Sequence, residues 1–218
     1  MADWVTISSL ATASGTLVLA VATFSSVRSA NRSARVAERS LLAAQRPVLI
    51  PSKEDDPAEL VRFGDEQILH VRGHGGAVVV GDETIYLAVG VRNGGSGLAV
   101  IHGWRTEPRE GSASERPDLE SFRRQQIDIY IPAGDSGYWL GALRDPSEAA
   151  YEPVRQAAQD GQALTVDLLY GDYEGGQRTI VRFVLAVWPT GEGDLDEDSN
   201  GRRVTALRYW NVDREDPR

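Results

Sequence analysis

The chain begins with a long uncharged stretch, and its later part alternates between apolar and polar positions. Residues 4–27 carry no charge and contain nine Val, Ile, Leu and Phe against nine Ser and Thr. A helix of that length reaches about 36 Å, more than the ~30 Å hydrocarbon core of a bilayer. Hydroxyl groups in a helix bond to the carbonyls of the preceding turn, which lowers their cost in lipid. The stretch therefore predicts a single-pass transmembrane helix.

Two other interpretations of this stretch stay open. Ala20-Val21-Ala22 is similar to a signal-peptide cleavage site, but Asp3 stands where a signal peptide carries basic residues. The helical pattern also continues beyond that site. A buried core helix would explain the many hydroxyl groups. We favour the membrane anchor over both.

Beyond residue 27, apolar positions recur at alternating spacings of three and four. These positions are Val27, Ala30, Ala34, Ala37, Leu41 and Ala44. Pro47 ends the pattern because proline lacks the N–H that a helix interior requires. We expect residues 1–46 to form a transmembrane helix that continues into a basic stalk helix. Three roles stay open for the stalk: dimerisation, contact of its basic face with anionic lipid, and packing as a linker on its own domain.

The charges beside the span indicate its orientation. Arg28, Arg32, Arg35 and Arg39 follow the span closely, whereas the other flank carries only Asp3 and the terminal amine. Positively charged flanks stay in the cytoplasm. We therefore predict a protein of the cell membrane with its N-terminus outside and its C-terminal domain in the cytoplasm.

After Pro47 the apolar pattern changes to a period of two, which is typical of half-buried antiparallel strands. About ten short strands are predicted, separated by glycine-rich turns. They cover residues 48–50, 61–63, 68–72, 77–80, 84–91, 98–106, 127–131, 138–143, 164–170, 179–187 and 204–210. So many short strands with short connections predict an antiparallel β-sandwich over residues 47–218 rather than a small barrel. The fold class is mainly β.

Two segments break the strand pattern. Asp145, Pro146 and Glu148 have the order of a helix N-cap, a first-position proline and a reciprocal glutamate. They predict a helix that Pro153 kinks or restarts and Gly161 ends. The polar residues 108–121 are expected to form an irregular crossover loop.

Composition excludes several kinds of chemistry. The chain has no cysteine, so it has no disulfide, thiol nucleophile or cysteine-held metal. A three-histidine metal site would need all three of its histidines, His70, His74 and His102. Both observations point away from a metalloprotein, and we predict no metal or other cofactor.

Charge is distributed unevenly along a chain whose net charge is −9. Residues 1–47 hold five arginines against two carboxylates, whereas residues 48–218 hold 18 basic groups against 30 acidic ones. A body this acidic repels a phosphate backbone, so we expect no nucleic-acid partner.

Several motifs carry a resemblance that covers nearly the whole chain. They are Arg46-Pro47, the segment from Arg92 to Ala99 (RNGGSGLA), Phe122-Arg123-Arg124-Gln125, Tyr130-Ile131-Pro132-Ala133-Gly134, Leu168-Leu169-Tyr170-Gly171-Asp172, Gly175-Gly176-Gln177-Arg178-Thr179 and Trp210-Asn211-Val212-Asp213-Arg214. With them the chain resembles uncharacterised bacterial, actinobacterial-type proteins that have one N-terminal transmembrane helix and an immunoglobulin-like sandwich. The resemblance implies this fold and membrane attachment, and no activity or catalytic residue.

One tetrapeptide matches a catalytic motif. Gly134-Asp135-Ser136-Gly137 spells the sequence around the nucleophile of chymotrypsin-like proteases. Tyr138 and Trp139 then replace the usual Gly-Pro, and His102 lacks its family motif. Since Gly, Asp and Ser also form turns, we interpret the tetrapeptide as a strand connection.

Two further patterns suggest metal binding weakly. Asp196-Glu197-Asp198-Ser199-Asn200-Gly201 matches the first half of a calcium loop, but Leu207 occupies the position of the bidentate carboxylate. We expect a solvated hairpin loop there. His70 and His74 would share one face only in a helix, whereas their surroundings predict a strand and a turn.

Clustered aromatic and basic side chains have two interpretations each. The aromatic set is Trp104, Trp139, Trp188, Trp210, Tyr86, Tyr130, Tyr138, Tyr170 and Tyr209. These rings either line a cleft or, as we prefer, fill the space between sheets. Arg123, Arg124, Arg178 and Arg182 either form a cationic patch or, as we prefer, pair with Asp128, Asp167 and Asp172.

These observations favour a membrane-anchored interaction or scaffold protein with a non-catalytic β-sandwich. Its expected partners are the lipid bilayer, an unknown protein, and a second copy through the N-terminal helix. No catalytic, cofactor-binding or metal-binding residue is predicted. The alternatives are a membrane-tethered sensor of a ligand or calcium, and an enzyme with an unrecognised site.

Overall fold

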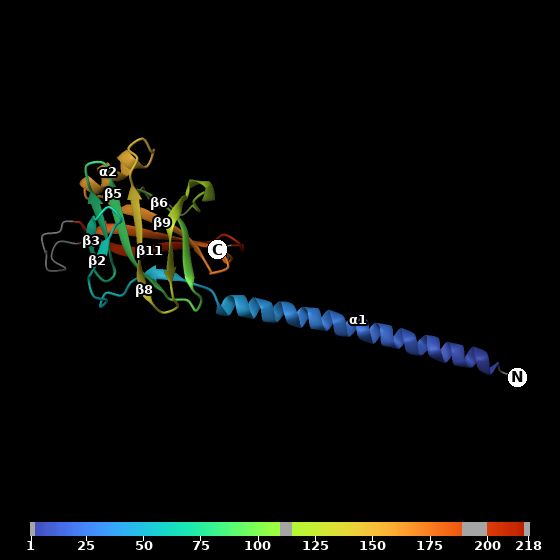
Figure 1. The fold of residues 1–218 in the computed structure, drawn as a ribbon. Helices are drawn as coiled ribbons and strands as arrows, with labels where there is room; N and C mark the ends of the chain where they lie inside the picture. Colours follow the sequence, from blue (N-terminus) through green and yellow to red (C-terminus); the bar gives the residue numbers. More distant parts are fainter. Residues whose placement is uncertain (1–2, 110–114, 189–199, 216–218) are drawn as a thin grey trace. The chain divides into compact units, whose positions relative to one another are not determined.

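The computed structural model describes residues 3–109, 115–188 and 200–215 (Figure 1). The chain divides into two compact units, Met1–Ala44 and Gln45–Arg218. The boundary between them lies close to the one expected after residue 46. We call the second unit the body.

The first unit is a single helix, α1, Trp4–Ala44, of 41 residues. It is long and apolar enough to cross a membrane, and none of its most apolar window is buried. The absence of burial in that window argues against a core helix. The hydroxyls of Thr12 and Thr16 each donate to the carbonyl four residues earlier, at 2.9 Å. These polar groups are thus satisfied within the helix, as lipid requires.

The described part of the body contains eleven strands, one α-helix and one 3-10 turn. The strands are β1 (Leu49–Pro51), β2 (Glu59–Arg62), β3 (Ile68–Val71), β4 (Gly75–Val80), β5 (Ile85–Asn93), β6 (Ala99–Pro108), β7 (Arg123–Ile131), β8 (Ser136–Leu143), β9 (Leu164–Gly171), β10 (Thr179–Val187) and β11 (Gly201–Asn211). The helix is α2 (Tyr151–Gln159), and the 3-10 turn is η1 (Leu119–Ser121). The alternating pattern of the sequence therefore predicted the strands well.

Nine strands form one curled antiparallel sheet in the order β1-β5-β4-β11-β10-β9-β6-β7, with β8 paired to the other edge of β5. The sheet folds over on itself between β4 and β11. These two strands pair over only three residues of β4, from Gly75 to Ala77. The apolar faces of β5 and β8 thereby pack against those of β9 and β10. Trp139, Tyr170 and Phe183 are fully buried in this shared core. The body is β-sandwich-like and mainly β, as predicted.

A separate hairpin, β2–β3, covers the outer face of β4, β5 and β8. Val61, Phe63 and Leu69 of the hairpin form a second small core with Ala77 and Ala88. The Phe63 ring meets the Tyr86 ring edge-on, with 5.0 Å between centroids. This hairpin forms one side of the groove described below.

The helix expected from Asp145 begins later than predicted. The Asp145 carboxylate accepts a hydrogen bond from the Ser147 N–H at 2.8 Å, and so closes a turn instead of capping a helix. The helix α2 starts at Tyr151, with Pro153 in its first turn, where no N–H is needed. Gly161, at a φ of +68°, follows the helix end as predicted.

Candidate functional site

A sizeable concavity in the described part of the chain lies between β7 and β8. It has a volume of about 490 Å³, within the range of ligand sites. We call it the arginine groove. Its lining residues are Arg62, Phe63, Gly64, Trp104, Arg123, Arg124, Gln125, Gln126, Ile127, Ile129, Leu140, Gly141, Ala142, Arg144, Asp145 and Glu148.

The arginine groove exists because β7 and β8, although consecutive, do not pair. Among the described strands, β8 pairs with β5 alone. β7 pairs with β6 at Ile101–Ile129 and again at Gly103–Arg124, so that His102 alone stands opposite residues 125–128. Such a bulge turns the strand away from its partner. Two strand edges therefore face the groove without a ladder partner in the described structure.

One side chain bridges the two edges. The Gln125 Nε2 donates to the Leu140 carbonyl at 3.3 Å, and its Oε1 accepts from the Trp139 indole N–H at 3.2 Å. A side-chain amide thus satisfies a backbone acceptor on the free edge of β8. Because the Leu140 carbonyl points away from β5, strand alternation directs the backbone groups of Tyr138 and Ala142 to the same edge.

Two of the four arginines in the groove are held by neighbours. Arg123 pairs with Glu148, and its guanidinium lies 5.2 Å from the Trp104 ring centroid. Burial lowers the pKa of Arg123. Arg144 pairs with Asp65 at 2.5 Å. The hydrogen bond from Arg144 holds the pKa of the Asp65 carboxyl below its usual value, and a second from the Tyr86 hydroxyl adds to this.

The other two arginines, Arg62 and Arg124, are exposed and have no ion pair among the residues that the structure describes. The groove lining holds four arginines against two carboxylates, in a chain whose net charge is −9. The arginine groove is therefore locally basic on an acidic body.

A second arrangement secures the start of the body, and we call it the seat: residues 45–49 with the loop 93–97. Asn93, fully buried, is its centre. Its Oδ1 accepts from the N–H groups of Val48 and Gly95, at 3.1 and 2.9 Å. Its Nδ2 donates to the carbonyls of Gly97 and Ile131, at 2.6 and 3.0 Å. The two motifs that carry the resemblance most clearly, Arg46-Pro47 and the RNGGSGLA segment, thus meet here.

Two tyrosines complete the seat. The Tyr209 hydroxyl donates to the Leu49 carbonyl at 2.8 Å, and the Tyr170 oxygen accepts from the Leu49 N–H at 3.3 Å. Burial raises the pKa of Tyr209 to about 12 and raises that of Tyr170 as well. Both hydroxyls therefore stay protonated at neutral pH and hold β1 in place.

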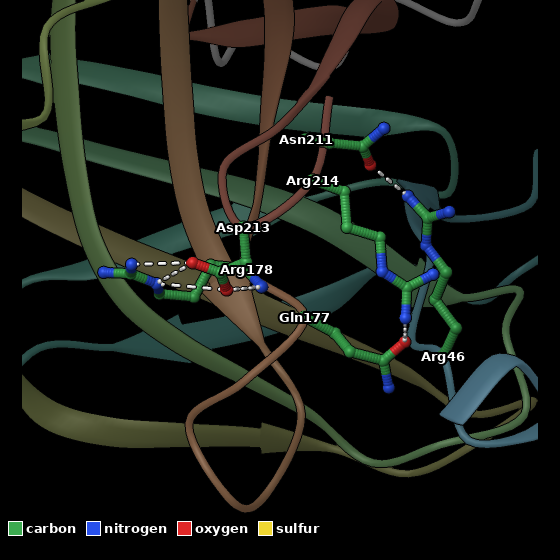
Figure 2. Close-up of a pocket in the computed structure, with 6 residues that line it drawn as sticks. All are labelled: Arg46, Gln177, Arg178, Asn211, Asp213 and Arg214. Atoms are coloured by element: carbon green, nitrogen blue, oxygen red, sulfur yellow. Dashed lines mark hydrogen bonds and ion pairs between the residues drawn. The ribbon is translucent and has the colours of Figure 1, made fainter. Parts of the chain in front are cut away.

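Beside the seat lies a small basic pocket formed by Arg46, Gln177, Arg178, Asn211, Asp213 and Arg214 (Figure 2). Arg178 makes a forked pair with Asp213, at 2.7 and 3.0 Å from its oxygen Oδ1. Arg46 donates to the Asn211 side chain at 2.5 Å. The pocket volume is about 10 Å³, the size of one water molecule, so we assign it no ligand.

The expected arginine–aspartate pairs are present in part. Arg182 on β10 faces Asp167 on β9, and two bonds of 2.7 Å join them. Arg178 pairs with Asp213, which lies outside the expected set of aspartates. Arg123 pairs with a glutamate outside the expected set. The alternation of the strands thus predicted the cross-strand pair and missed partners that come from loops.

The candidate catalytic and metal motifs form no site in the described residues. Ser136 begins β8 and donates to Asp56 at 2.9 Å, not to a histidine. His70 lies on β3, whereas His74 lies in the turn before β4 at a φ of +55°. No group of three potential metal ligands occurs among the residues that the structure describes. Most of the acidic half-loop, residues 196–199, lies outside the described residues.

The aromatic side chains mainly fill the core, as preferred. Trp139 and Tyr170 are buried there, and the Trp104 ring packs edge-on against Trp139 at 5.2 Å. Trp104 also lines the arginine groove, so both interpretations hold for this residue. Gln125 and Asn93, the two central polar residues, were not singled out from the sequence. Both nevertheless lie in motifs that carry the resemblance.

Comparison with known proteins adds no relative. No protein-family model matches the chain, and neither does any curated protein or solved structure.

Proposed function

We propose that this chain is a membrane-tethered interaction module whose body binds a partner protein in the arginine groove. The observation that carries the proposal is the groove itself, about 490 Å³ between two unpaired strand edges. Exposed strand edges are usually blocked or covered in soluble proteins, because they pair with other chains. An edge left open inside a shaped and charged groove fits a recognition surface.

The chemistry of the lining favours binding over catalysis. The side chains are arginine, glutamine and apolar groups, with Asp145 and Glu148 as the carboxylates. Glu148 is neutralised by Arg123. The lining offers neither a serine, threonine or cysteine nucleophile nor a histidine base. The proposal is therefore a non-catalytic module.

The tether in this proposal is α1 in a cell membrane, with the N-terminus outside and the body in the cytoplasm. Arg28, Arg32, Arg35 and Arg39 are spaced by four, three and four residues, which places them on one face of α1. A basic stripe beside the span supports this orientation through the positive-inside preference. Self-association through α1 and an immunoglobulin-like relationship of the body are parts of the same proposal.

Site-directed crosslinking in the full-length chain tests the binding surface. A photoreactive amino acid replaces Ile127, which lies in the groove and is 77% exposed. The matched control position is Leu207 on β11, which is 47% exposed and does not line the groove. In the native cells, we expect discrete protein adducts at position 127 and none at 207. Equal labelling at both positions, or none at 127, contradicts the proposal.

Topology and attachment need a separate experiment. Reporter fusions at Arg218 should be active in the cytoplasm, and the full-length chain should sediment with membranes with residues 1–30 intact. A reporter active outside the cell contradicts the orientation. A chain that has lost its first residues and floats free of membranes shows a cleaved signal peptide.

A further inference from the structure

We infer that the arginine groove takes an extended acidic peptide of the partner, which adds as a strand along the free edge of β8. The inference rests on the proposed function and names the ligand class of the same site. Three features of the groove support it: backbone geometry, charge and the apolar lining.

The backbone geometry shows a peptide-like group already in position. The Gln125 carboxamide donates to the Leu140 carbonyl and accepts from the Trp139 indole N–H. A carboxamide has the same donor and acceptor as a peptide bond. The peptide group of an added strand can make the bond to Leu140 in its place. The outward groups of Tyr138 and Ala142 extend the same ladder along β8.

Opposite β8, β7 is the last strand of the sheet, so its outer edge has no ladder partner in the described structure. Residues 125–128 stand opposite the single residue His102 of β6. Ile127 on this bulge is highly exposed and lines the groove. The occupant can therefore contact backbone on both sides, which favours an extended chain over a compact small molecule.

Charge selects the kind of peptide. Arg62 and Arg124 lie at the groove without an ion pair among the described residues, on a chain of net charge −9. An acidic ligand is repelled by most of this chain and attracted here, which gives both affinity and register. A basic peptide would meet four arginines in the groove.

The apolar lining determines which type of side chain the ligand carries at every second position. Phe63, Trp104, Ile129 and Leu140 line the groove together with the arginines. Successive side chains of a strand point to opposite faces. A fitting ligand therefore alternates β-branched or aromatic residues with aspartate or glutamate, and it lacks proline.

A random peptide library tests this ligand class without knowledge of the partner. Decapeptides displayed on phage are selected against the full-length protein in detergent micelles. We expect the enriched peptides to be acidic, alternating and free of proline. Synthetic copies are then measured by fluorescence anisotropy. Their binding should weaken with rising salt, and the double variant Arg62→Glu, Arg124→Glu should bind about tenfold or more weakly.

Two controls separate strand addition from simple charge attraction. Arg203→Glu changes an arginine on β11 that does not line the groove, and it should bind like the wild type. Hydrogen exchange with bound peptide should show new protection in residues 138–142. No enrichment, enrichment of basic peptides, equal loss in both variants, or protection confined to other strands overturns the inference. If crosslinks at Ile127 capture a protein while the library fails, only the ligand class is wrong.

Discussion

Asn93 shows how a single side chain can hold three segments of the body together. Its four hydrogen bonds reach Val48 just before β1, the loop 93–97 and the end of β7. Each bond alone contributes only about 1 kcal/mol, but a buried polar group left without a partner costs about 1–3 kcal/mol. The residue has no substitute, because it needs an acceptor and two donors on one short side chain.

Replacement of Asn93 tests this role. Asn93→Ala leaves two partly buried donors and two acceptors without their partner, so we expect a loss of about 2–4 kcal/mol in the free energy of unfolding. Asn93→Asp keeps the acceptor for Val48 and Gly95 and places a carboxylate against the carbonyls of Gly97 and Ile131. It should also destabilise the body. Urea denaturation measures both variants, and a stable Asn93→Asp contradicts the assigned donors.

The Arg178–Asp213 pair predicts a specific pH dependence. Hydrogen bonds from Arg178 hold the pKa of the Asp213 carboxyl below its usual value. A carboxyl whose pKa is lowered by folding stabilises the protein at pH values above its pKa in the unfolded chain. This stabilisation is lost as the pH falls through the pKa of the carboxyl in the folded chain. The two side chains are 41% and 30% exposed, so we expect only about 0.5–1 kcal/mol. At pH 6 the wild type should have a higher free energy of unfolding than Asp213→Asn. This difference should vanish as the pH falls from about 5 to 2.

Asp82→Asn is the matched control for that measurement. Asp82 is an exposed aspartate in the turn between β4 and β5. Its variant should follow the wild-type pH curve. A wild-type advantage over Asp213→Asn that persists unchanged at pH 2 would show that the effect comes from packing rather than charge.

Among the elements, β1 depends most on its surroundings. It has only three residues and pairs only with β5 in the described structure. The loop 93–97 approaches the segment that leads into β1 so closely that a Cβ atom on Gly97 would come within 1.8 Å of the Gln45 carbonyl oxygen. Real Cβ atoms do not approach backbone this closely, so glycine is required there by space.

Gly97→Ala should therefore loosen the seat. We expect a loss of about 1–3 kcal/mol, because the backbone of residue 45 must move. Gly64→Ala is the control, since a Cβ on Gly64 meets nothing within 4 Å. Thermal unfolding compares the two. Equal melting temperatures would disprove the close contact.

The Tyr209 hydroxyl, which holds β1, makes the stability of the body depend on pH in the alkaline range. Burial raises the pKa of its hydroxyl to about 12, from a usual value of about 10. The unfolded chain loses this proton first, so stability is complete below about pH 10 and falls as pH rises toward 12. Tyr209→Phe removes this contribution and should have a flatter stability curve above pH 10. An unchanged alkaline slope would show that Tyr209 ionises normally.

The elements that the sequence predicted are those with an uninterrupted pattern. Alternation located the strands because one face of each is buried. The same alternation through Ile127, Ile129 and Ile131 predicted an ordinary strand, whereas the structure bulges β7 away from β6. The alternation of apolar and polar residues indicates which face of each strand is buried, but it does not indicate which strands pair. The arginine groove forms because β7 and β8 do not pair, so it could not be predicted from the sequence. Arg123 and Arg124 were nevertheless singled out from the sequence.

For the whole molecule, the body and the helix α1 are separate compact units, and the membrane association of the chain should reside in the helix. The fragment Gln45–Arg218 retains the whole seat, including the bonds of Asn93 and Leu49. We expect it to stay in solution, to fold, and to melt at the same temperature as the full-length chain in micelles.

A shorter fragment shows why the boundary lies there. A chain that starts at Ser52 lacks β1, so the Tyr209 hydroxyl loses its acceptor and the Asn93 Oδ1 keeps only the Gly95 N–H of its two donors. The fully buried Leu49 is also missing from the core. Each orphaned buried group costs about 1–3 kcal/mol, so this fragment should melt many degrees lower. Because residues 45–49 link the body to α1, the same bonds hold the tether. If both fragments melt at the same temperature, the seat is not part of the stable body.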